Sequence, residues 1–302
     1  MKQEYNNFFW RTGLEITPET FIQADNYNCY QQNLIRKIIN REFYGLLPAN
    51  SEDKQELTIK ADLDDLKISI KQLCCRGITK EGFLIDFDDN LLSSAIKITL
   101  SISDSPGKYY VVIRINPYEQ VLMEPVENEN APFSHPAYEL VIKKLTQIEG
   151  NELPVLKIVF DGNYPQIDQN YIPPCMSVLS HKRLLDYYLN CKQVCNEILT
   201  LLKHKKEQYG QFILPVSILI LDIEHFSLSE PPYFLIQQFR KLLKAFGFCI
   251  KELQSNIENI INMPYNHNDI EEIFKSLTSC LNEILLIVGK EEVIEEDFTP
   301  QI

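Results

Sequence analysis

A seven-residue hydrophobic repeat runs through the second half of the chain, and it limits the folds that the chain can adopt. Over 181–202, 236–260 and 270–287, apolar side chains recur in alternating steps of three and four residues. This spacing places them along one side of an α-helix and is typical of bundles and coiled coils. The sequence therefore predicts three long helices. The residues expected in their shared core or at an oligomer contact are Leu184, Tyr188, Ile198, Ile236, Phe239, Leu243, Phe246, Ile250, Leu253 and Ile257.

Signals for helix starts support these ranges. Pro231 and Pro232 stand where a first turn tolerates proline, and Asn268 and Glu271 have capping-box spacing. Additional apolar positions widen the stripes, so each helix is expected to bury more than one side. These positions include Leu185, Leu199, Leu242 and Ile261. Two interpretations stay open: copies of the chain associate through the surplus positions, or a monomeric bundle buries them all.

The first half of the chain has a different hydrophobic periodicity. Between residues 57 and 172, short alternating or apolar runs such as YYVVIRI (109–115) are separated by turn residues such as NPYE (116–119). Several short strands of this kind predict an antiparallel β-sandwich. Helices are expected at 25–43 and, as an insertion, at 136–148.

The two rhythms together predict an α+β chain with two domains. A length of 302 residues is enough for two separate hydrophobic cores. We expect a β-sandwich domain over 1–174, a helical bundle over 175–290 and an acidic tail over 291–302.

Charge and hydropathy exclude several classes of partner. With 29 basic and 42 acidic residues the formal charge is 29 − 42 = −13, which repels phosphate backbones, so no nucleic-acid partner is expected. The longest apolar run, 213–221, is shorter than the roughly 20 residues that span a bilayer. The start MKQEYNN lacks the basic and apolar parts of a signal peptide. We therefore expect a cytoplasmic protein without direct membrane insertion.

Catalytic and ligand-binding patterns are absent from the sequence. It contains no GxSxG, P-loop, GxGxxG or HExxH motif. Cys191 and Cys195 have the spacing of two metal ligands on a helix but lack a partner cluster, and DFDDN (86–90) lacks the rest of a calcium loop. We expect no enzyme activity, cofactor, metal or small-molecule substrate. An enzyme of unrecognised type remains an alternative.

The N-terminal segment carries the single tryptophan. Phe8, Phe9 and Trp10 stand close together near the start of the chain. Rigid aromatic side chains are favoured at the centres of protein interfaces. The segment is therefore either a docking site for another protein, an anchor in the sandwich core or a ligand-stacking edge.

Motif-like segments occur in order along the chain. The first is W-x-x-G-L followed by P-x-x-F, formed by Trp10, Gly13, Leu14, Pro18 and Phe21. The later ones are YGL (44–46), the pair Gly77 and Gly82, an I-P-P step in 170–188, and the segments 231–246 and 265–277. Together they resemble the TssK family of type VI secretion baseplate subunits, although Thr79 and Lys80 replace the usual Phe-Pro.

This resemblance implies a fold and a role. The fold is a β-sandwich shoulder akin to that of phage receptor-binding proteins, followed by an α-helical neck that forms a homotrimer. The role is structural: the shoulder binds the wedge subunits TssF and TssG of a contractile injection machine, on the cytoplasmic side of the inner membrane. Family members continue into a head domain, whereas this chain ends soon after Gly289, so a shortened version is expected.

Under this resemblance the aromatic segment is expected to dock the wedge subunits. The residues concerned are Phe8, Phe9, Trp10, Leu14 and Phe21. The alternative function is a phage-tail-like receptor-binding module, which would need a further exposed tip.

Overall fold

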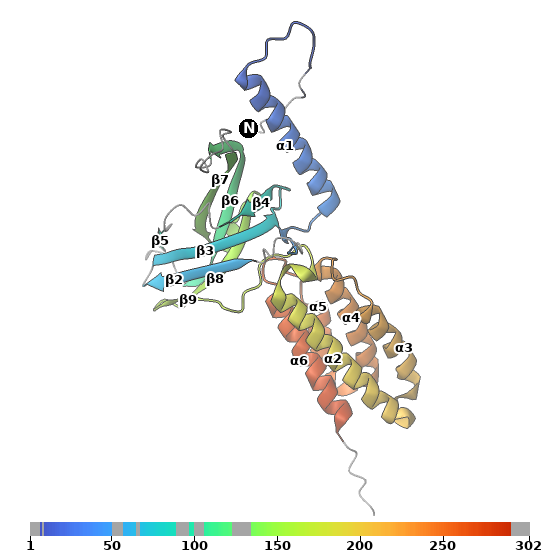
Figure 1. Cartoon of the computed structure of the whole chain (residues 1–302). Helices are drawn as coiled ribbons and strands as arrows, with labels where there is room; N and C mark the ends of the chain where they lie inside the picture. The colour runs from blue at the N-terminus through green and yellow to red at the C-terminus, as the bar shows by residue number, and fades with distance from the viewer. Residues whose placement is uncertain are drawn as a thin grey trace, which may run out of the picture. The chain divides into compact units, whose positions relative to one another are not determined.

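The computed structural model describes residues 7, 9–49, 57–64, 67–88, 97–99, 106–122 and 134–290 (Figure 1). The chain divides into two compact units. The first unit comprises 1–182 with the short segments 228–232 and 266–270, and the second comprises 183–227, 233–265 and 271–302. Two connections between helices of the second unit are therefore part of the first.

Two antiparallel sheets build the first unit (Figure 1). In the five-stranded sheet the long strand β3 pairs with all four others, and the four-stranded sheet has the order β7-β6-β8-β9. The strands of the first sheet are β1 (Gly45–Leu46), β2 (Thr58–Asp64), β3 (Lys67–Ile78), β4 (Leu84–Phe87) and β5 (Lys97–Thr99). Those of the second are β6 (Gly107–Leu122), β7 (Ser134–Lys143), β8 (Glu152–Phe160) and β9 (Pro165–Ile167).

The two sheets meet through side chains of β4, β7 and β8. The rings of Phe87 and Tyr138 form an edge contact with centroids 5.3 Å apart, and the Tyr138 hydroxyl donates to the carbonyl of Asp86. At Gly77 of β3 there is no room for a side chain, because a Cβ would lie 2.6 Å from the Leu153 side chain. The apolar core of the unit thus lies where the sheets approach each other.

The structure corrects two predictions in this unit. The helix expected at 136–148 is instead strand β7, followed by a short 3-10 turn at Leu145–Gln147. The turn expected at NPYE (116–119) is a bulge inside β6, where the register shifts between Asn116 and Gln120. Both errors have one cause: β7 pairs with β6 on either side of the bulge, and this long-range pairing outweighs local preferences.

Helix α1 (Pro18–Asn40) precedes the sheets. Thr17 caps it, because the Thr17 and Thr20 side chains each bind the other residue's backbone, and Pro18 occupies the first turn. A helix was expected here from residue 25, and the cap explains why it begins earlier.

The second unit consists of helices, which Figure 1 shows running alongside one another. They are α2 (Lys182–His204), α3 (Lys206–Glu224), α4 (Pro232–Cys249), α5 (Gln254–Asn262) and α6 (Glu271–Gly289). Helices were predicted at the positions of α2, α4 with α5, and α6. Helix α3 was not predicted, because its apolar run and Pro215 obscure the helical period.

The single helix expected over 231–262 is broken. The chain leaves helical geometry at Ile250, where ψ is 85°, makes a 3-10 turn at Lys251–Leu253 and resumes as α5. Ile250, Leu253 and Ile257 nevertheless remain buried, and Gly247 leaves space for Ile257. The apolar residues of the stripe thus stay buried, although the helix is interrupted. Antiparallel sheets and six α-helices in the described part of the chain confirm the α+β class.

Candidate functional site

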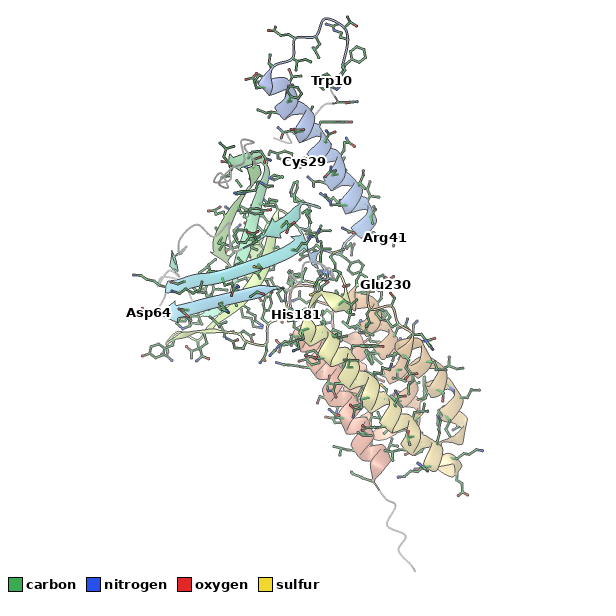
Figure 2. The ribbon with its side chains drawn as sticks, in the orientation of Figure 1. Trp10, Cys29, Arg41, Asp64, His181 and Glu230 are labelled. Carbon is green, nitrogen blue, oxygen red and sulfur yellow. The ribbon has the colours of Figure 1, made fainter. Side chains whose placement is uncertain are left out.

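The N-terminal aromatic segment lies at the surface of the first unit. Phe9 is 79% exposed, Trp10 53% and Phe21 57%, while Leu14 is half-buried; Phe8 lies outside the described residues. Such exposure does not fit an anchor in the sheet core. Figure 2 shows Trp10 beside the beginning of α1. The structure thus leaves Phe9, Trp10 and Phe21 accessible to a partner.

Helix α1 turns a polar side toward the sheets. The carbonyl of Asn33 lies 2.6 Å from the position of a Cβ on Gly82, so the helix and the β3–β4 turn are in close contact. Asn33 is 5% exposed, accepts a hydrogen bond from Arg36 and donates one to Cys29.

A cavity of about 440 Å³ lies between α1 and the sheets. Asp25, Cys29 and Arg36 line it from the helix, and Phe83 and Tyr118 from the sheet side. Charged, polar and aromatic groups share its wall without converging on one point. It gives no reason to assign a substrate.

Three of the motif-like segments meet at one junction within the first unit. Leu46 of the YGL segment pairs with Cys175, just after the I-P-P step, and its amide donates to the carbonyl of Pro174. The Tyr44 hydroxyl donates to Asn268 at 2.7 Å, and the Nε2 of His267 donates to the Tyr44 carbonyl at 2.5 Å. The sequence suggested no common purpose for these segments. The structure shows that they connect the sheets with the loop between α5 and α6.

A buried ion-pair cluster strengthens this junction. The Nζ of Lys157 on β8 lies 3.1 Å from Asp168 and 3.3 Å from Asp269. The Lys157 side chain is 6% exposed and that of Asp269 10%. Burial by itself lowers the pKa of Lys157, but the hydrogen bond with Asp168 and the charge of Asp269 outweigh it and raise the pKa. Lys157 therefore stays charged and holds the α5–α6 loop on the sheet.

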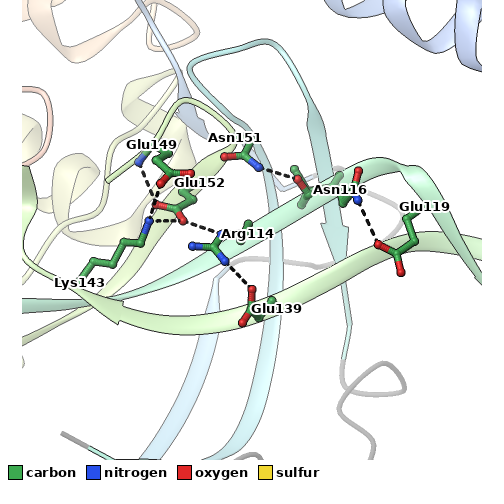
Figure 3. A network of polar contacts seen from close by, with 9 residues as sticks. Arg114, Asn116, Glu119, Glu139, Lys143, Glu149, Asn151 and Glu152 are labelled. Atoms are coloured by element: carbon green, nitrogen blue, oxygen red, sulfur yellow. Dashed lines mark hydrogen bonds and ion pairs between the residues drawn. The ribbon is translucent and has the colours of Figure 1, made fainter. Parts of the chain in front are cut away.

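A second buried carboxylate belongs to Glu152 at the start of β8 (Figure 3). Its side chain is fully buried, and Lys143 and Arg114 both bind its Oε1, at 2.7 and 2.8 Å. The backbone amide of Glu149 adds a third donor. Burial raises the pKa of Glu152, but these donors outweigh it and bring the pKa below 4.5. The network is structural, because three donors occupy the carboxylate.

Acidification is expected to weaken the junction through His267. Burial lowers the pKa of His267 below 6.5, against the Tyr44 hydrogen bond, which raises it. The unfolded chain therefore binds a proton more readily, so the contribution of His267 to stability is present above pH 6.5 and is lost as the pH falls through its folded pKa. We expect the free energy of unfolding in urea to fall between pH 7.5 and 5.5 by up to about 1.4 kcal/mol per pH unit.

The variant His267→Gln should lose most of this pH dependence. His204→Gln, at an exposed position on α2, is the matched control and should retain it. Titration of Glu152 does not affect this measurement, because the pKa of Glu152 lies below 4.5, outside the pH range used. Equal slopes for the wild type and His267→Gln would contradict the assignment.

In the second unit, the stripe residues face inward. All ten residues predicted from the repeat are 8% exposed or less within a single chain. They are therefore covered without any second copy. A contact between copies would need a different surface.

Helix α3 provides an exposed apolar row. Leu214, Ile218 and Leu221 are 70%, 51% and 49% exposed and follow the four-three spacing of a coiled-coil seam, which Gln211 extends. We call these four residues the α3 seam. Residues 208–221 contain no charged side chain. Copies of a chain with a charge of −13 repel each other, so a charge-free helix face is suited to contact between copies.

Metal and membrane sites find no support in the described residues. Cys75, Cys175, Cys191 and Cys195 are buried thiols, and burial raises the pKa of each. No group of three or more potential metal ligands comes together within the described ranges; Asn90 of the DFDDN segment lies outside them. No helix in that part of the chain combines the length and apolar character needed to cross a bilayer.

Comparison with known proteins identifies the fold. No protein-family model and no curated protein matches the sequence. A crystal structure of TssK matches with a TM-score of 0.64 and 14% identity, over 93% of this chain and 70% of that one. A chain of the type VI secretion TssK–TssF–TssG baseplate subcomplex matches with a TM-score of 0.65 and 14% identity, over 94% of this chain and 100% of that one.

A chain of a type VI baseplate complex agrees, with a TM-score of 0.59 and 14% identity over 94% of this chain and 100% of that one. The protein therefore has the fold of the type VI secretion baseplate subunit TssK.

Proposed function

We propose that the chain is a structural component of a type VI secretion baseplate and not an enzyme. The observation that carries this proposal is the match with TssK structures over nearly the whole chain. In this proposal residues 1–174 form a β-sandwich shoulder, 175–290 a helical-bundle neck and 291–302 an acidic tail. The assembly forms in the cytoplasm, at the inner membrane.

The proposed partners are the wedge subunits TssF and TssG. The neighbour structure that contains TssK, TssF and TssG supports this choice. Exposed aromatic side chains at the start of the first unit offer a docking surface, since aromatic residues contribute much of the binding energy at interfaces.

Replacing Trp10 tests the docking surface. Trp10→Ala should weaken binding to purified TssF–TssG about 30-fold, the effect of losing a hot-spot side chain worth about 2 kcal/mol. Phe248→Ala, at an aromatic residue of α4 that is 76% exposed, is the control and should bind like the wild type. Calorimetry of both variants gives the comparison. If Trp10→Ala binds TssF–TssG with the affinity of the wild type, this docking site is wrong. If the wild type itself does not bind TssF–TssG, the proposed function is wrong.

The proposed oligomer is a homotrimer assembled through the α3 seam. Light scattering after size exclusion should give a mass near three chains for the wild type. Leu214→Glu should dissociate the trimer and raise its dissociation constants at least about a hundredfold, because it buries an unpaired charge. Leu286→Glu, at a leucine of α6 that is 69% exposed, should leave the mass unchanged. If the Leu214→Glu variant is still a trimer, the α3 seam is not the contact between copies. If the wild type is a monomer, the proposed trimer is wrong.

A further inference from the structure

Helix α1 has its polar and apolar sides in an unusual arrangement. The contact between Asn33 and Gly82 defines the side that faces the sheets, and Cys29 and Arg36 lie on that side. A helix that packs on a sheet normally turns its apolar stripe inward. Here the inward side is rich in polar groups, so burial against the sheets does not explain the apolar residues of α1.

Those apolar residues face outward. Ile35, Ile38 and Ile39 are 56%, 75% and 71% exposed, and Leu34 is 36% exposed. They occupy adjacent positions on the last two turns of the helix, and we call them the α1 outer face. Clustered exposed aliphatic side chains of this kind mark a surface that a partner covers.

The charge around this face is the opposite of the charge of the whole chain. Residues 26–42 contain three basic residues, Arg36, Lys37 and Arg41, and one acidic residue, Glu42, although the chain as a whole carries −13. Arg36 donates to the neutral oxygens of Asn33 and Gln32. In the ranges that the structure describes, none of these three cations forms an ion pair. Because Arg36 lies on the cavity side of α1, the α1 outer face combines an apolar ridge with two basic residues at its margin, Lys37 and Arg41.

We propose that the α1 outer face binds an acidic amphipathic helix of a wedge subunit, a step that rests on the proposed function. The ridge covers about two helical turns and is convex, which suits packing along the apolar stripe of another helix. Lys37 and Arg41 would pair with acidic residues flanking that stripe, as charged positions do beside a coiled-coil seam. Two cations are fewer than the four to eight that mark binding to anionic lipid.

The test uses the full-length protein and purified TssF–TssG complex. Ile38→Asp should reduce affinity at least a hundredfold, because it places a carboxylate in the apolar contact and opposite acidic groups. Lys37→Glu should reduce it about tenfold, and the affinity of the wild type should fall as salt is raised. Leu286→Asp, at an aliphatic residue of the second unit that is 69% exposed, should bind normally. Circular dichroism would verify that each variant is folded.

The outcomes separate this inference from the function on which it rests. If the wild type and Ile38→Asp bind TssF–TssG with equal affinity, the α1 contact is overturned and the proposed baseplate function is unaffected. A wild type that does not bind TssF–TssG overturns the proposed function itself. Loss of binding to phosphatidylglycerol vesicles by Ile38→Asp, with unchanged binding to TssF–TssG, would assign the face to a membrane and overturn the helix partner.

Discussion

Gly45→Ala should lower the free energy of unfolding by at least about 3 kcal/mol, because two separate costs add at this position. Gly45 has a φ of +126°, a conformation that residues with a side chain rarely adopt. A Cβ would also lie 2.1 Å from the carbonyl oxygen of Pro174, which is backbone and cannot swing away. The pairing of Leu46 with Cys175 would have to open.

Gly210→Ala provides a control of opposite sign. Gly210 lies inside α3, where the nearest atom to a new Cβ is on the flexible Lys206 side chain at 3.8 Å. Alanine there should stabilise the protein by about 0.5–1 kcal/mol through its higher helix propensity. Urea unfolding at pH 7.5 measures both variants. If Gly45→Ala unfolds at the same urea concentration as the wild type, the result contradicts the close contact described between β1 and the Pro174 carbonyl.

Lys157→Met is the second variant with a large expected effect. It removes the cation from the buried cluster and leaves the carboxylates of Asp168 and Asp269 facing each other with little solvent. Removing one partner of a buried pair costs about 3–5 kcal/mol, because the carboxylates lose their buried counterion and keep only the exposed Lys108 beside Asp269. The free energy of unfolding should fall by this amount.

Lys108→Met is the control that separates the effect of burial from the effect of losing a positive charge. Lys108 also pairs with Asp269, at 3.7 Å, but its side chain is 58% exposed. The same substitution should therefore cost less than about 1 kcal/mol, as for surface pairs. Equal losses for the two lysine variants would show that the Lys157 cluster is not shielded from solvent, and the proposed anchoring of the α5–α6 loop would lose its basis.

Local sequence patterns predicted the helices of the second unit well where each had one apolar stripe. In α2 and α6 the stripe marks the buried side, since a helix of this period places those residues together. In α3, apolar residues surround the helix and Pro215 interrupts the pattern, so the local signal failed. The exposed row on α3 became visible only when the buried side of the helix was known.

Long-range contacts account for what the sequence could not predict. Strand β7 was mistaken for a helix because its partner β6 determines its conformation. Lys157 and Asp269 are 112 positions apart, and no spacing rule connects them. The aromatic segment was a candidate from composition, but whether Trp10 is exposed or buried depends on packing.

The amino-acid sequence by itself determined the α+β class, the positions of the long single-stripe helices and the absence of recognisable catalytic motifs. These properties follow from periodicity and residue type, which act over a few neighbouring positions. Only the tertiary structure decided which side of α1 and of α3 stays exposed, and which distant residues meet at the junction. Burial is a property of the folded surface, because it depends on neighbours that the chain brings together only after it has folded.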